Sequence, residues 1–148
     1  MTDAPDAFEL SDDAARLDRD LVHRWLSEQA YWSLGRPREV QDAAIDSSRN
    51  FGVYRARTGQ QVAYARVVTD GATFGWLCDV FVEERLRGQG LGSMLLKGVC
   101  ATLAPLQLSR LLLATADAHE VYRSFGFEEL TNPERYMARS AGRTLGRS

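Results

Sequence analysis

The sequence predicts an α/β fold of the α+β kind, in which helices flank a mixed, mostly antiparallel sheet. Three observations carry this expectation. Apolar residues recur at helical spacing over residues 17–29 and 37–48. The period changes to two over residues 51–82, where Thr58-Gly59 and Asp70-Gly71 are typical of hairpin turns. A glycine-rich loop then leads from the last of these strands into a further helical pattern.

The N-terminal third is expected to contain one strand and two helices. The strand covers Phe8–Ser11, and the first helix follows it. One face of that helix carries the apolar residues Leu17, Leu21, Val22, Trp25 and Leu26. Pro37 suits the first turn of the second helix, because the fixed φ of proline is compatible with the start of a helix.

The central part is expected to form a three-stranded meander over residues 51–57, 61–69 and 73–82. Its last six residues are almost continuously apolar, which is typical of a strand buried on both faces. After the glycine loop, the spacing predicts a helix to about residue 102 and a strand over 110–114. A short helix follows, which starts at an Asp117 N-cap and ends at Gly126. Two further strands are expected over 127–130 and 136–138.

Length and composition narrow the class of protein. The 148 residues fit a single domain, 1–148, with frayed ends at about 1–7 and 139–148. A hydrophobic content of 45% argues against a disordered chain, and a net charge of -2 argues against a broad nucleic-acid-binding face. The apolar runs are far shorter than the roughly 20 residues that cross a bilayer. Two cysteines, Cys78 and Cys100, and two histidines give little support for a metal site. We expect a soluble, cytoplasmic protein.

The main chemical signal is the segment from Arg87 to Ser93, which contains Gly88, Gly90 and Gly92. Glycines let backbone N–H groups approach an anion closely, and the start of a helix adds partial positive charge. A pyrophosphate fits such a loop. The alternative is a turn that only reverses the chain, but the position between a buried strand and a helix favours the anion site.

The glycine spacing excludes two common phosphate loops. The dinucleotide fingerprint GxGxxG fails, because its third glycine would fall at Ser93 or at Leu95. A P-loop needs Gly-Lys-Ser/Thr, which does not occur in the chain. Nucleotide hydrolysis and nicotinamide chemistry are therefore disfavoured.

Two motifs resemble those of the GCN5-related N-acetyltransferases, the GNAT family. Arg87-x-x-Gly90-x-Gly92, between a strand and a helix, resembles the family's acyl-CoA pyrophosphate loop. Tyr122-x-x-x-Gly126-Phe127 resembles its closing motif, and the order of the predicted elements matches over roughly residues 8–138. The run Tyr31-Trp32-Ser33-Leu34-Gly35-Arg36-Pro37 is similar to a subgroup of small bacterial members.

The resemblance implies acetyl-CoA as the acetyl donor and a small-molecule or peptide amine as the acceptor, with direct attack in a ternary complex and no metal. It also implies that the coenzyme lies in a V-shaped opening between two splayed central strands, the one ending at Val82 and the one over 110–114. Dimers are common in the family, so a homodimer is compatible with it. The implied coenzyme-binding residues, mostly through the main chain, are Phe81, Val82, Arg87, Gly88, Gln89, Gly90, Leu91, Gly92 and Ser93.

Two residues are candidates for catalysis. The resemblance gives Tyr122 the role of general acid toward the departing thiolate, where the alternative is a core tyrosine. Asp79 interrupts the apolar strand, and alternation places it on one face with Leu77 and Phe81. It binds the amine or accepts its proton, with a pKa raised by apolar surroundings, or else it is the structural partner of an arginine or a backbone N–H. Both interpretations stay open.

Four further residues are weaker substrate candidates. Tyr31, Trp32 and Phe51 are either walls of the acceptor pocket or core residues. His119 is three residues before Tyr122 and either relays a proton or is an exposed first-turn residue. Cys78 is a core cysteine rather than an acyl-enzyme nucleophile, because direct transfer is the usual route in the family.

The sequence thus predicts an acetyl-CoA-dependent N-acetyltransferase. One rival is a module that binds acyl-CoA as a sensor without turnover. The other is an interaction protein built on the same scaffold, which would not need three glycines at the start of a helix.

Overall fold

The computed structural model describes residues 7–141. The chain divides into two compact units, Met1–Thr115 and Ala116–Ser148, and each is described by itself. Most of the predicted frayed ends lie outside the described residues, which include only residues 7 and 139–141 of them.

The first unit contains a five-stranded sheet in the order β1-β2-β3-β4-β5. Neighbouring strands are antiparallel except β4 and β5, which are parallel. This mixed, mostly antiparallel sheet confirms the predicted fold class. The elements are β1 (Phe8–Ser11), α1 (Arg19–Glu28), α2 (Arg38–Asp46), β2 (Arg49–Arg55), β3 (Gln61–Thr69), β4 (Phe74–Val82), α3 (Leu91–Leu103) and β5 (Arg110–Leu112).

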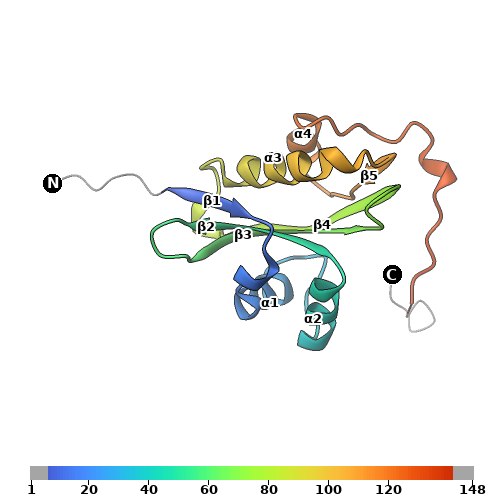
Figure 1. Cartoon of the computed structure of the whole chain (residues 1–148). Coiled ribbons are helices and arrows are strands. Elements are labelled where there is room, and N and C mark those ends of the chain that lie inside the picture. Colours follow the sequence, from blue (N-terminus) through green and yellow to red (C-terminus); the bar gives the residue numbers. More distant parts are fainter. Residues whose placement is uncertain (1–6, 142–148) are drawn as a thin grey trace. The chain divides into compact units, whose positions relative to one another are not determined.

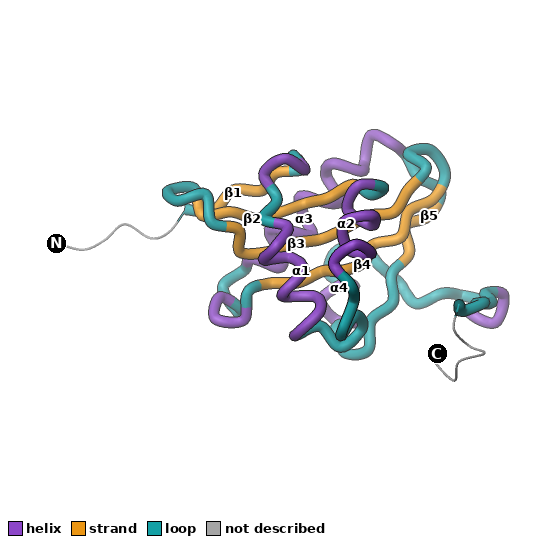
Figure 2. Tube along the Cα trace, turned by 90° about the horizontal axis from the view of Figure 1, so that it is seen from below, coloured by secondary structure: helices purple, strands orange, loops and turns teal. Residues whose placement is uncertain are grey.

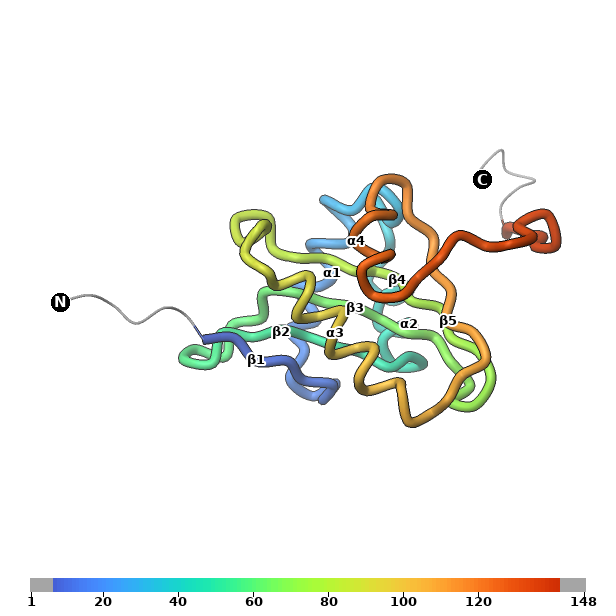
Figure 3. The backbone as a smooth tube through the Cα atoms, turned by 90° about the horizontal axis from the view of Figure 1, so that it is seen from above, coloured from blue at the N-terminus to red at the C-terminus, as the bar shows by residue number. Residues whose placement is uncertain are grey.

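Helices cover both faces of the sheet. Helices α1 and α2 lie on one face and α3 on the other (Figure 1). The view from below shows α1 and α2 in front of the strands (Figure 2), and the view from above shows α3 crossing them (Figure 3). The core on the α1–α2 side consists of Val22, Trp25, Leu26, Ala30, Ile45, Tyr64 and Phe81. On the other face, α3 buries Leu91, Leu95, Leu96, Val99 and Leu103.

The start of each helix on the first face follows from local chemistry. The Asp18 carboxylate is the N-cap of α1 and accepts a hydrogen bond of 3.1 Å from the Leu21 N–H. The sequence predicted Pro37 in the first turn of α2. In the structure Pro37 is the N-cap, and the helix begins one residue later, at Arg38. The acidic side chain of Asp20 forms an ion pair with Arg38, which ties α1 to α2.

The strand that is buried on both faces is β3, not β4. All of the residues from Gln61 to Ala65 are buried. In β4, buried and half-buried residues alternate instead. The prediction for residues 77–82 was therefore wrong in this respect, because one side of that segment has no strand beside it.

Strands β4 and β5 separate soon after they begin. Only three residue pairs join them, from Phe74 opposite Arg110 to Trp76 opposite Leu112. Beyond Trp76, the β4 segment 77–82 has no strand partner on that side among the described residues. The strand predicted over 110–114 ends at Leu112. The sheet therefore opens between its two parallel strands, as the resemblance implied.

A β-bulge interrupts β4 at Asp79. Arg66 is opposite Cys78 and Tyr64 is opposite Phe81, so β4 holds one more residue than β3 between these pairs. The φ angle of Asp79 is 54°, which is uncommon for a residue other than glycine. The extra residue ends simple alternation, so Phe81 lies on the face of Cys78 and not on that of Leu77. The predicted shared face of Leu77, Asp79 and Phe81 was wrong for this reason.

The second unit contains the short helix α4 (His119–Arg123) and a 3₁₀ turn at Pro133–Arg135. Ala118 is the N-cap of α4, so the predicted Asp117 cap was wrong by one residue. The strands predicted over 127–130 and 136–138 were also wrong, since neither segment forms a strand in the described chain. A strand needs a neighbour for its backbone, and the Phe127 N–H instead donates to the Tyr122 carbonyl oxygen at 3.2 Å.

Candidate active site

The glycine loop leaves open space above its backbone. Gly88 has a φ of 82° and Gly90 a φ of 86°, which favour glycine. A Cβ built on either residue would have no atom within 4 Å. Glycine is therefore needed here for backbone conformation, and the vacant volume beside the chain is accessible to a ligand.

Helix α3 begins directly at this loop without a side-chain cap. Its N-cap is Gly90, and no acidic residue is present in the first turn. The N–H groups of Leu91, Gly92 and Ser93 thus have no capping carboxylate or hydroxyl. Unsatisfied N–H groups and the helix dipole together favour an anion at this position.

Arg87 is more engaged than the sequence suggests. Its backbone N–H donates to the Glu84 carbonyl oxygen at 3.3 Å. Its side-chain Nε donates to the Val82 carbonyl oxygen at 3.0 Å, and its guanidinium lies 5.0 Å from the centre of the Phe81 ring. The Arg87 N–H thus already has an acceptor within the chain, and its implied role in holding a pyrophosphate stays a prediction.

The open edge of β4 presents backbone groups to the gap beside β5. The Glu83 N–H donates to the Val62 carbonyl oxygen of β3 at 2.9 Å. Since successive residues of a strand point their backbone groups to opposite sides, those of Val82 point away from β3. Val82 thus offers a backbone N–H at the open edge, while Arg87 occupies its carbonyl oxygen. The Phe81 side chain is 4% exposed and stacks on Trp25 at 5.3 Å between ring centres.

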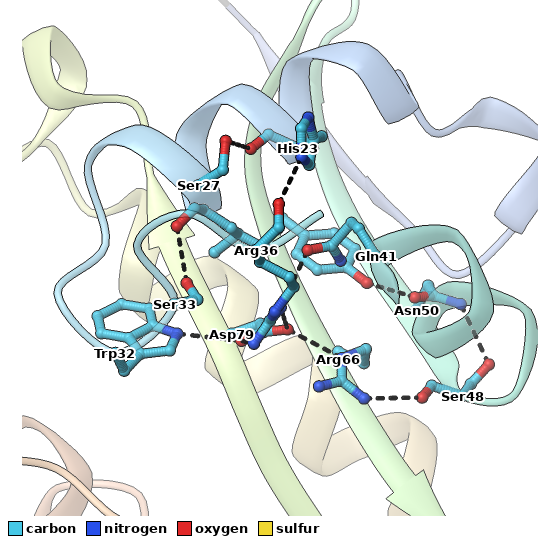
Figure 4. Close-up of polar contacts among 12 residues, drawn as sticks. His23, Ser27, Trp32, Ser33, Arg36, Gln41, Ser48, Asn50, Arg66 and Asp79 are labelled. Atoms are coloured by element: carbon cyan, nitrogen blue, oxygen red, sulfur yellow. Dashed lines mark hydrogen bonds and ion pairs between the residues drawn. The ribbon is translucent and has the colours of Figure 1, made fainter. Parts of the chain in front are cut away.

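Asp79 is the centre of a buried polar cluster (Figure 4). Its Oδ2 accepts from Arg36 Nη1 at 2.8 Å and from Arg66 Nε at 2.9 Å. Its Oδ1 accepts from Trp32 Nε1 at 3.0 Å. The Asp79 side chain is 1% exposed, against 19% for Arg36 and 13% for Arg66. Of the two open interpretations, the structure shows the structural partner of an arginine.

The charge state of Asp79 differs from the expectation. Burial alone raises the pKa of this carboxyl, but the hydrogen bonds and charges of Arg36 and Arg66 outweigh it and lower the pKa below its ordinary value. The predicted rise of the pKa was therefore wrong. A carboxylate with a lowered pKa and donors on both oxygens is a poor proton acceptor, so the structure argues against Asp79 as the base.

The cluster joins the loop between α1 and α2 to the sheet. Arg36 Nη1 also donates to Gln41 Oε1 at 2.9 Å, and its backbone carbonyl oxygen lies 2.8 Å from His23 Nε2. Ser33 Oγ donates to the Leu26 carbonyl oxygen at 2.7 Å. These bonds hold the loop beside the bulge of β4, and Figure 4 shows Trp32 and Arg36 next to Asp79.

The three aromatic candidates separate into two environments. Tyr31 is 60% exposed and Trp32 is 44% exposed, and their rings meet edge to face at 5.0 Å. Phe51 is fully buried. It pairs with Ala65 and shares the face of Val82, which approaches Gly92 of α3. Of its two open interpretations, wall of the acceptor pocket or core residue, the structure shows Phe51 in the core under α3.

Neither cysteine is suited to nucleophilic catalysis. Cys78 lies beside the cluster, and its burial raises the pKa to about 11 despite the opposing charges of Arg66 and Arg36. Burial also raises the pKa of Cys100. Among residues 7–141, no group of histidine, cysteine or acidic side chains is arranged to hold a metal ion. No described helix is long and apolar enough to cross a bilayer.

In the second unit, the Tyr-x-x-x-Gly-Phe motif ends helix α4. The Tyr122 carbonyl oxygen accepts from Phe125 and Phe127, and Gly126 has a φ of 90°. The rings of Tyr122 and Phe127 meet edge to face at 5.8 Å. The glycine therefore reverses the chain so that the phenylalanine packs on the tyrosine. His119 is the exposed first residue of α4.

Sequence reasoning missed the two arginines that hold Asp79. Arg66 belongs to β3, and Arg36 follows the helix α1 by eight residues. One signal was available for Arg66, because a charged residue within a strand that is otherwise apolar needs a partner. The acid that becomes the partner of Arg66 depends on the strand register, which the sequence alone does not reveal.

The site thus combines an opened sheet edge with a glycine loop at an uncapped helix start, an arrangement that favours an anionic ligand. Comparison with protein families identifies the class of protein. The model of the acetyltransferase (GNAT) family matches residues 19–127. The chain belongs to the GNAT family of acetyltransferases.

Three relatives illustrate the match. A crystal structure from Xanthomonas campestris pv. campestris, of a protein assigned to the GNAT acetyltransferases, is 39% identical, with a TM-score of 0.86 over 91% of this chain and 94% of that chain. The "Putative acetyltransferase FG08082" of Gibberella zeae is 30% identical over 131 residues, 76% of this chain and 74% of its own. N-acetylglutamate synthase from Neisseria gonorrhoeae, solved with coenzyme A and N-acetyl-glutamate, is 18% identical with a TM-score of 0.70, over 88% of this chain and 30% of that chain, and shows the fold alone.

Proposed function

We propose that the protein is an N-acetyltransferase that moves the acetyl group of acetyl-CoA to an amine by direct attack in a ternary complex. One observation carries the proposal. The unpaired edge of β4 leads through a 3₁₀ turn at Glu84–Leu86 into Gly88 and Gly90, whose backbones face open space, and then into the uncapped start of α3. Coenzyme A is bound in the structure of one relative with this fold, which supports acetyl-CoA as the donor.

Each part of the chain has a task in this proposal. Acetyl-CoA supplies the acetyl group as a thioester. The N–H groups from Gly88 to Ser93 hold its pyrophosphate, with Gln89 contributing only its backbone. The Val82 N–H bonds the pantetheine arm. Tyr122 holds a proton at its hydroxyl and gives it to the departing thiolate.

No dedicated base is assigned to this chain. Asp79 is ionised at neutral pH because its pKa is lowered, and both of its oxygens already accept hydrogen bonds. The amine therefore loses its proton to solvent water.

The competing function is a sensor that binds acetyl-CoA without turnover. A thermal-shift titration with acetyl-CoA tests binding, and thiol release with a panel of amines tests turnover. We expect both to be positive. Binding without thiol release above the rate of hydrolysis would favour the sensor, and absence of binding would contradict both functions.

We expect Tyr122→Phe to lower kcat by about 10²-fold, because general acid catalysis typically contributes about 10² to 10⁴ and a thiolate needs little assistance to leave. KM should change less, since the hydroxyl acts as charge develops on sulfur. The measurement is steady-state thiol release with the best acceptor found.

A matched control is Tyr54→Phe. Tyr54 is buried in β2, and its hydroxyl has no hydrogen-bond partner among the described residues. This variant removes the same atom and should leave kcat unchanged. If the kcat of Tyr122→Phe stays within a factor of about two of the wild-type kcat when chemistry is rate-limiting, Tyr122 is not the acid. That factor corresponds to only about 0.4 kcal/mol of activation free energy.

A further inference from the structure

The cluster around Asp79 has more positive than negative charge. Arg36 and Arg66 both pair with this one carboxylate. Among residues 7–141, neither arginine forms an ion pair with a second acid. The buried cluster therefore carries one net positive charge in the folded protein.

The cluster also has more hydrogen-bond donors than acceptors. Each guanidinium has five N–H groups. Apart from Asp79, the only side-chain acceptors that they meet within the described chain are Gln41 Oε1, bonded to Arg36, and Ser48 Oγ, 3.2 Å from Arg66 Nη1. Gln41 is fully buried, and among the described residues its Nε2 is the one donor of the cluster that is buried without a partner. The guanidinium N–H groups left over are therefore available to water or to an acidic ligand.

The cluster is next to the open edge of the sheet. Figure 4 shows Asp79 between Trp32 on one side and Arg66 on the other. Since Arg66 belongs to β3, the Trp32 side is the unpaired side of β4. Both arginines keep part of their surface exposed, 19% for Arg36 and 13% for Arg66. An anion can therefore contact the exposed part of each guanidinium.

We infer that the acceptor is a compact amine that carries an acidic group, and that Arg36 and Arg66 bind this group. The inference rests on the proposed function, because the bulge at Asp79 is upstream of the glycine loop on the strand along which the pantetheine would lie. A carboxylate or a phosphate neutralises the net charge and accepts from the unused guanidinium N–H groups. The face of Trp32 provides apolar contact to the carbon skeleton.

The test compares amines in matched pairs that differ only in the acidic group. Glycine and phenylalanine are each paired with their carboxamides, and phosphoethanolamine is paired with ethanolamine. The first arms test a carboxylate and the last tests a phosphate. We expect kcat/KM for the acidic member of at least one arm to exceed that of its neutral partner by about tenfold or more, as hydrogen bonds to charged groups provide.

Arg66→Gln then assigns the preference to the cluster. It leaves the Arg36–Asp79 pair in place and removes the net charge. We expect the preference to fall to about threefold or less. Arg38→Gln removes the same charge from α2, where Arg38 pairs with Asp20 and Asp42 outside the cluster, and should keep the preference. If Arg66→Gln does not fold, Arg36→Gln, which keeps the Arg66–Asp79 pair, replaces it.

Three outcomes would overturn the inference: neutral partners used as well as acidic ones, turnover of neutral amines but of no acidic amine, or a preference that survives both cluster variants. Each of these outcomes requires that some amine is turned over. Failure of the proposed function is distinct, because then no amine, neutral or acidic, would release thiol above the rate of hydrolysis.

Discussion

Gly90→Glu is expected to abolish the stabilisation of the protein by acetyl-CoA. The substitution places a side chain in the open space above the loop and a negative charge where the pyrophosphate would bind. At a coenzyme concentration about a hundred times Kd, the wild-type protein should gain about 2.7 kcal/mol, a Tm rise of roughly 5–10 °C. The variant should show no rise in a thermal-shift titration, while its circular dichroism stays that of a folded protein.

The control substitution must introduce the same backbone strain, that of a side chain at a positive φ angle. Gly59, between β2 and β3, has a φ of 77°, and a Cβ added to it would have no atom within 4 Å. Gly59→Glu therefore introduces the same strain and charge in another turn, and its coenzyme-dependent shift should equal that of the wild type. A normal shift in Gly90→Glu would show that the glycine loop is not the coenzyme site.

Asp79→Asn is expected to lower the free energy of unfolding by about 2–4 kcal/mol at neutral pH. The amide keeps the shape of the side chain but leaves Arg36 and Arg66 without their carboxylate. Because both arginines retain some contact with solvent, we expect less than the full loss of a completely buried pair. Urea denaturation measures this change.

The loss should depend on pH with a definite sign. The pKa of Asp79 in the folded protein is below its ordinary value of 3.8, so its contribution is complete above that value and decreases as the pH falls through the folded pKa. The difference between wild type and Asp79→Asn should thus be constant from about pH 5 to 8 and narrow below about pH 4.

Asp42→Asn provides the matched control on the same side of the protein. Asp42 also pairs with two arginines, Arg19 and Arg38, but its side chain is 37% exposed. Exposed pairs contribute about 0–1 kcal/mol, so this variant should be nearly as stable as the wild type. Equal losses in the two variants would mean that burial of the Asp79 cluster has no special effect on stability.

Local patterns predicted most of the fold. Helical spacing located α1 and α2, and the turns at Thr58-Gly59 and Asp70-Gly71 located the hairpins on either side of β3. These signals are local because hydrogen bonds within a turn or a helix join near neighbours. The strands expected after Gly126 were wrong, since a strand depends on a distant partner that sequence patterning does not identify.

The candidate site was predictable where it depends on the backbone of one segment. The glycine-rich loop lies between a strand and a helix as the sequence predicted, and the positive φ angles of Gly88 and Gly90 give a physical reason for its glycines. The ion pairs of Asp79 were not predictable, because its partners Arg36 and Arg66 are 43 and 13 residues away in the sequence. The bulge that turns Asp79 toward them comes from strand register, and simple alternation does not reveal it.

The most direct test of the account is a single-turnover reaction with acetyl-CoA labelled in the acetyl group. Mass spectrometry then follows the label in the coenzyme, in the protein and in a panel of amines that includes the acidic pairs. We predict that the label appears in an amine in step with thiol release and that none accumulates on the protein. Label that stays on the coenzyme while acetyl-CoA is bound would contradict the account.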